Sequence, residues 1–144
     1  MLTRRATILG IGCVLVLPRP AAATPEEVRA SIIETFGPGA LAEGPIELEL
    51  PPLAESGNSV PLTVRVPQGG VRRLALFTEQ NPRPKACEAI FGPASAETSL
   101  TTNIRLASTQ FVICVAEMSD GSLMTARHEV RVVVGACSTL PSRY

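Results

Sequence analysis

After a Gly-Pro-Gly sequence at residues 37–39, the chain consists of short apolar segments separated by residues that favour turns. Apolar and polar side chains alternate in several of these segments, as where Leu62 and Val64 flank Thr63. A period of two gives a strand one buried and one solvated face. Seven strands are predicted on this basis, at 46–50, 60–66, 71–78, 86–91, 98–106, 110–118 and 123–134. Their close spacing favours an all-β sandwich of two antiparallel sheets.

The core of such a sandwich must be aliphatic. The chain has no Trp, one Tyr and four Phe, so the large aromatic side chains that fill many cores are scarce. We therefore expect one domain whose interior is packed with Val, Leu, Ile and Ala side chains.

A different period precedes the strands. Within 26–36, Val28, Ile32 and Phe36 recur at the four-residue spacing of one helical face. Thr24 is a suitable N-cap, a proline follows it at the first turn, and two glutamates come where the helix dipole favours acidic side chains. The sequence predicts one short N-terminal helix.

The first residues have the composition of an export signal. Arg4 and Arg5 precede an uncharged apolar stretch over 6–17, and small residues follow, so we expect residues 1–23 to be a removed signal peptide. The paired arginines fit the twin-arginine (Tat) route. Two alternatives are a single membrane anchor, for which the stretch is short, and a lipoprotein processed at Cys13.

Charge argues against a nucleic-acid partner. The expected signal carries three of the 13 basic residues and none of the 13 acidic ones, which leaves a formal charge of −3 on the rest. Binding to phosphates requires clustered Lys and Arg, and only Arg72 with Arg73 and Arg83 with Lys85 come close. We expect these four to be solvated strand and loop residues. We also expect no membrane contact once the signal is removed.

Most catalytic and metal-binding patterns are missing from the sequence. The single histidine, His128, lies in the last predicted strand, and one histidine builds neither a zinc cluster nor, without a nearby Ser or Cys, a catalytic triad. The cysteines have no C-x-x-C spacing, and acidic residues are scattered. We therefore predict no cofactor, no metal site and no enzymatic activity, with His128 an ordinary strand residue.

The cysteines are the remaining reactive groups. Cys137 follows the last predicted strand on small residues, where a thiol is more often kept for reactivity than for packing. Cys87 and Cys114 lie inside predicted strands and form either a disulfide with each other or two separate core thiols. In both cases Cys137 is the accessible thiol; the alternatives for it are a partner in a disulfide, an intermolecular link or a relic thiol without a role.

Several segments resemble a known family. The blocks at 103–110 and 115–122, together with 81–84, 91–93 and the twin-arginine start, are similar to SoxY, the sulfur-carrier subunit of bacterial thiosulfate oxidation. The resemblance implies an immunoglobulin-like sandwich in the periplasm and a heterodimer with a second sandwich subunit, SoxZ. It also implies that a cysteine on a carboxyl-terminal Gly-Gly-Cys-Gly-Gly arm holds sulfur while separate Sox enzymes load, oxidise and hydrolyse it.

The carboxyl-terminal arm departs from that pattern. Gly135 is retained, but Ala136 and Ser138 flank the thiol of Cys137 and further residues follow it. We expect a sandwich domain over 24–134 and an arm over 135–144. The predicted function is a periplasmic covalent sulfur carrier that uses Cys137. The alternatives are a non-carrier binding or dimerising relative of SoxY and a thiol-disulfide redox protein.

Overall fold

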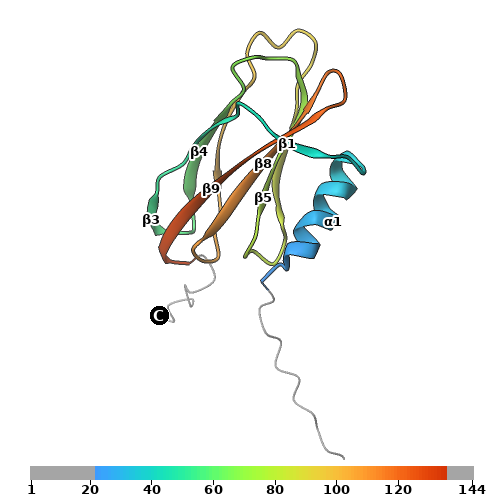
Figure 1. The fold of residues 1–144 in the computed structure, drawn as a ribbon. Helices are drawn as coiled ribbons and strands as arrows, with labels where there is room; N and C mark the ends of the chain where they lie inside the picture. Colours follow the sequence, from blue (N-terminus) through green and yellow to red (C-terminus); the bar gives the residue numbers. More distant parts are fainter. Residues whose placement is uncertain (1–21, 136–144) are drawn as a thin grey trace, which may run out of the picture.

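The computed structural model describes residues 22–135, and these form one helix and nine strands. The helix α1 spans Pro25–Phe36. The strands are β1 (Leu41–Glu43), β2 (Glu47–Glu49), β3 (Leu53–Ser56), β4 (Val60–Arg65), β5 (Val71–Thr78), β6 (Lys85–Ile90), β7 (Ser99–Ile104), β8 (Gln110–Met118) and β9 (Leu123–Val134) (Figure 1). The seven predicted strands are all present, with boundaries within two residues of those expected.

The strands form two sheets. The larger sheet has the order β1-β9-β8-β5-β6, and β3 also pairs with β9; the smaller sheet has the order β2-β4-β7. Pairing is antiparallel except where β1 and β3 run parallel to β9. The expected all-β sandwich with a short N-terminal helix is confirmed.

The space between the two sheets holds the main core. Fully buried side chains from the larger sheet, such as Leu76 and Val112, meet Leu62 and Val64 of β4. The members of this cluster are almost all aliphatic, as the composition predicted. Burial of this apolar surface is the main favourable contribution to folding.

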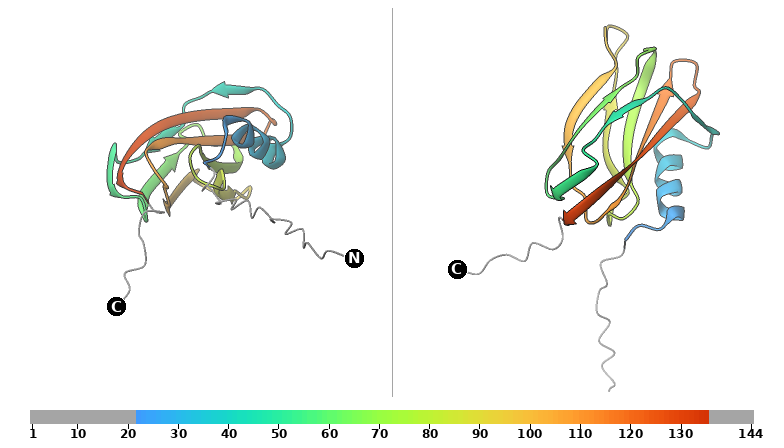
Figure 2. Two further views of the ribbon diagram at one scale, coloured as in Figure 1. Left: turned by 90° about the horizontal axis from the view of Figure 1, so that it is seen from below. Right: turned by 60° about the vertical axis from the view of Figure 1, so that its left-hand side comes forward.

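The helix α1 covers the outer face of the larger sheet (Figures 1 and 2). Val28 and Ile32 are buried against Ala75, Phe77 and Val115, which alternate with core-facing residues on β5 and β8. Both faces of β5 are therefore buried. The predicted helical face is confirmed, with Phe36 partly buried beside the same cluster.

The start of α1 has a capping box. The Thr24 hydroxyl accepts a hydrogen bond from the backbone N–H of Glu27, and the Glu27 carboxylate accepts one from the backbone N–H of Thr24. These bonds satisfy N–H groups that have no partner within the helix. The preceding residue, Ala23, is 6% exposed and packs with the helix cluster. The folded part therefore includes the residue that was expected to end the signal segment.

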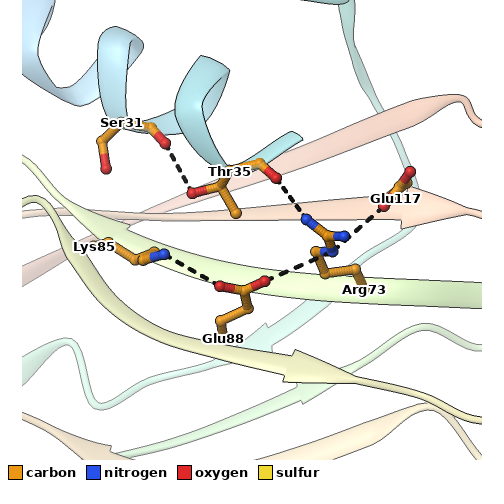
Figure 3. A network of polar contacts seen from close by, with 6 residues as sticks. All are labelled: Ser31, Thr35, Arg73, Lys85, Glu88 and Glu117. Atoms are coloured by element: carbon orange, nitrogen blue, oxygen red, sulfur yellow. Dashed lines mark hydrogen bonds and ion pairs between the residues drawn. The ribbon is translucent and has the colours of Figure 1, made fainter. Parts of the chain in front are cut away.

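Arg73 joins the carboxyl end of α1 to the sheet. Its guanidinium donates a hydrogen bond to the carbonyl oxygen of Thr35 at 2.6 Å and lies 3.6 Å from both Glu88 on β6 and Glu117 on β8 (Figure 3). It also lies over the ring of Phe36. Arg72 is exposed, as expected, but Arg73 is only partly exposed, because the helix and two carboxylates pack around its guanidinium group.

The strands β1 and β3 were not predicted. Each is only three or four residues long, and each pairs in parallel with the same edge of β9. Two prolines at Pro51 and Pro52 precede β3 and indicate a bend rather than a strand. Such short segments become strands because β9, at 12 residues, provides a long edge for pairing.

The helix α1, the one helix within residues 22–135, is not long and apolar enough to cross a membrane.

Candidate functional site

The strand β9 ends in a hydrogen-bonded support. The Val134 carbonyl accepts a hydrogen bond from the Gly57 N–H at 2.7 Å, and the Gly57 carbonyl accepts one from the Leu106 N–H at 2.8 Å. The Thr109 hydroxyl accepts from the Val132 N–H at 3.0 Å. The last residues of the strand are thus held by the two loops beside them.

These contacts define one end of the sandwich, which we call the arm-bearing end. It consists of the turn at 57–59, the loops at 79–84 and 105–109 and the last residues of β9, and it lies at the bottom of Figure 1 and of the right-hand view in Figure 2. Gly135 is the last residue that the structure describes. The predicted sulfur attachment site, Cys137, and its neighbours Ala136 and Ser138 lie outside the described residues.

A pair of amide side chains ties the loops of the arm-bearing end together. Asn81 donates from Nδ2 to the Arg105 carbonyl at 2.7 Å, and its Oδ1 accepts from the N–H of Ala107 and from Nε2 of Gln110. Gln110 is buried, and its Oε1 accepts from the N–H of Gln80 at 2.8 Å. We call this group the amide clamp. This clamp was not predicted from the sequence, because a clamp needs two residues that are distant along the chain.

The structure places Cys87 and Cys114 on the same face of the larger sheet as free thiols. Both are in register with Leu76, Cys87 from β6 and Cys114 from β8, so β5 lies between them. Two strand spacings separate their Cα atoms by roughly 9–10 Å, whereas a disulfide requires roughly 4.4–6.8 Å. The disulfide considered from the sequence is therefore not formed, and the alternative of two core thiols describes the structure.

Neither of these thiols has the environment of a reactive cysteine. Burial, with a smaller contribution from nearby Cys87, raises the pKa of Cys114 to about 12. Burial also raises the pKa of Cys87, and a hydrogen bond to the backbone of Leu76 offsets part of the effect. Since the thiolate is the nucleophile, both side chains are chemically quiet near neutral pH.

His128 lies on β9 in register with Val112. Its Nε2 atom is buried and has no hydrogen-bond partner among the described residues. Within the described part of the chain, no group of His, Cys, Asp and Glu side chains is arranged to hold a metal ion. No catalytic partner for His128 is found among the described residues.

Comparison with known families decides the relationship. The profile of the family described as "Sulfur oxidation protein SoxY" matches residues 32–137, which is most of the chain. The chain belongs to the SoxY family. The resemblance seen in the sequence is thereby confirmed, and the family match extends to Cys137.

A solved SoxY structure supports the assignment. The chain is similar to the sulfur carrier protein SoxY from Chlorobium limicola f thiosulfatophilum, with 26% sequence identity and a TM-score of 0.68 over 76% of this chain and 98% of that chain. No curated protein matches the sequence.

The fold also occurs outside the SoxY family. A superoxide reductase (neelaredoxin) from Ignicoccus hospitalis matches with 17% identity and a TM-score of 0.53, over 77% of this chain and 94% of that chain, and its T24K form matches with 18% identity and the same TM-score, over 76% of this chain and 92% of that chain. Identities this low show a shared sandwich fold alone.

Proposed function

We propose that this protein is a periplasmic sulfur carrier that holds sulfur intermediates covalently on Cys137. The observation that carries the proposal is the SoxY family match, which runs through the whole sandwich and ends at Cys137. Cys137 follows the end of β9 by three residues, so the support of Val134 by Gly57 provides a firm base for an arm. The sulfur carrier SoxY from Chlorobium has the same fold.

The proposed chemistry is a covalent capture of thiosulfate. The Cys137 thiol loses its proton, and its sulfur bonds to the outer sulfur of thiosulfate to give a cysteine S-thiosulfonate. Two electrons leave in this step, and a separate oxidising enzyme must accept them. Release by hydrolysis requires another enzyme, because the core thiols and His128 supply no base at the arm.

The carrier role implies protein partners. We propose a heterodimer with a SoxZ-like sandwich subunit, together with Sox-type enzymes that load and process the bound sulfur. The protein itself then needs neither cofactor nor catalytic site.

The alternative of a thiol-disulfide redox protein has less support. That chemistry requires a resolving cysteine next to the reactive one. Cys87 and Cys114 are fixed within the sheet on either side of β5 and have raised pKa values, so neither is suited to exchange with an arm thiol.

Intact-mass spectrometry tests the carrier proposal. Protein incubated with thiosulfate and the partner enzymes is expected to gain the mass of one thiosulfate group, and reductant should remove it. The variant Cys137→Ser should gain nothing, whereas the control Cys87→Ser should be loaded like the wild type. An unmodified wild-type protein would indicate that the carrier step has been lost, and equal loading of Cys137→Ser would show that sulfur is held at another residue. Either result contradicts the proposal.

A further inference from the structure

A basic depression lies at the arm-bearing end, between the edges of the two sheets. It has a volume of about 470 Å³ and is formed by the loop at 79–84, the start of β6 and the end of β7. Three cationic side chains line it, Arg83, Lys85 and Arg105, together with the amides of Asn81 and Asn103. The strands β6 and β7 are the outer strands of their sheets, so the depression is on an open side of the sandwich.

The charge in this depression is largely uncompensated. No acidic side chain is among the described residues that line it. Lys85 reaches Glu88 at 3.2 Å, but Arg83 and Arg105 make no ion pair with any residue in 22–135. Two guanidinium groups without an ion-pair partner among residues 22–135 thus line the same depression as the ammonium group of Lys85.

The loops that carry these cations are held in place. The amide clamp bonds Asn81 directly to the carbonyl of Arg105, which joins the two basic loops. The N–H and hydroxyl of Thr78 both donate to the carbonyl of Pro84, at 2.8 and 3.2 Å, and fix the other side of the first loop. Donors that are positioned in advance lose less entropy when an anion binds.

The depression is close to the base of the arm. Val134 is bonded to Gly57 and Gly57 to Leu106, the residue that follows Arg105. Two such backbone spacings amount to roughly 10 Å, and the three residues from Val134 to Cys137 span at most roughly 10 Å. A group attached to the arm and a free anion from solvent are both within range of the same cations.

We propose that this depression binds a sulfur oxyanion of the thiosulfate and sulfate type, either free or as the sulfonate end of a group carried on Cys137. The oxyanion chemistry follows from the cations, because guanidinium groups match tetrahedral oxyanions in geometry and charge. The choice of sulfur rests on the proposed carrier function.

Calorimetric titration at low ionic strength tests the site. The starting protein is Cys137→Ser, which cannot be loaded, titrated with sodium thiosulfate and, separately, sodium sulfate. We expect saturable binding, and we expect its dissociation constant to rise at least tenfold when Arg83→Gln and Arg105→Gln are both added to Cys137→Ser. The matched control Arg72→Gln removes an exposed charge at the opposite end of β5 and should change the dissociation constant less than twofold. Circular dichroism and thermal melting verify that each variant is folded.

A second titration separates the two sources of the oxyanion. Wild-type protein loaded with thiosulfate should bind sulfate more weakly than Cys137→Ser if the carried sulfonate occupies the site, and equally well if only free anions do. Both results support the site. The absence of saturable binding in Cys137→Ser, or equal loss in the double variant and Arg72→Gln, overturns the proposal. Because Cys137→Ser forms no adduct, this outcome is independent of whether the protein is a carrier.

Discussion

At the scale of single residues, folding determines which thiol is available. Cys114 is completely buried, and desolvation keeps its thiol protonated far above neutral pH. Cys87 is half-buried, with a raised pKa for the same reason. Neither of these two thiols is therefore available as a thiolate near neutral pH. This leaves Cys137 as the proposed attachment site.

The raised pKa of Cys114 predicts a loss of stability in alkali. In the unfolded chain this thiol ionises near its ordinary pKa, whereas in the folded protein it stays protonated to about pH 12. The stabilisation is thus complete below about pH 9 and is lost as the pH rises toward 12. Each pH unit between about 9 and 12 should lower the free energy of unfolding by about 1.4 kcal/mol.

Urea denaturation at a series of pH values measures this effect. The variant Cys114→Ala should be less stable than the wild type at pH 7, because it leaves a cavity, but its stability should fall less steeply between pH 9 and 10.5. The two proteins differ only at this position, so the difference in slope isolates the ionisation of the thiol. Identical slopes would contradict the prediction.

At the scale of elements, the junction of α1 with the sheet depends on one cation. Replacing Arg73 with Met removes its bond to the carbonyl of Thr35 and leaves Glu117 partly buried without its ion-pair partner, while Glu88 retains only Lys85. We expect Arg73→Met to lower the free energy of unfolding by about 1–3 kcal/mol. The neighbouring variant Arg72→Met should change it by less than about 0.5 kcal/mol, since that side chain is exposed.

Chemical denaturation compares the two variants, and hydrogen exchange of the α1 amides shows whether the effect is local. Faster exchange along α1 in Arg73→Met, with β4 unchanged, is the expected pattern. Equal stability of the two variants would show that the network adds nothing to the packing of Val28 and Ile32.

The elements themselves differ in how far the sequence predicts them. The helix was predictable because its cap, its proline and its apolar spacing are local signals. The strand β4 alternates cleanly, with Val60, Leu62 and Val64 buried. By contrast, β1 and β3 have no local pattern and exist only because β9 pairs with them, and the environment of Arg73 depends on three other elements.

At the scale of the whole molecule, residues 22–135 contain both apolar clusters and all nine described strands. We therefore expect a chain ending at Gly135 to fold, with a melting temperature within about 2 °C of that of the chain ending at Tyr144. A chain ending at Val130 loses the residues that pair with β3 and should melt at least about 5 °C lower. Differential scanning calorimetry decides between these expectations, and a large loss on truncation at Gly135 would contradict them.

The candidate site shows the same division between local and distant information. Cys137 could be singled out because a thiol after the last strand is unusual in the sequence alone. The basic depression could not, because Arg83 and Arg105 come together only when Asn81 joins two loops that are far apart along the chain. The positions of Cys87 and Cys114 on either side of β5 likewise depended on strand order, which the sequence did not determine.

The pairing of β3 with the last residues of β9 has a mechanical consequence. β3 runs parallel to β9 and bonds to it as far as Val134, and Thr109 holds Val132 from another loop. Tension applied at Gly135 along the axis of β9 would load these bonds in shear, so that they would share the tension instead of breaking one after another. The described domain should therefore resist unravelling from its carboxyl end when tension is applied there.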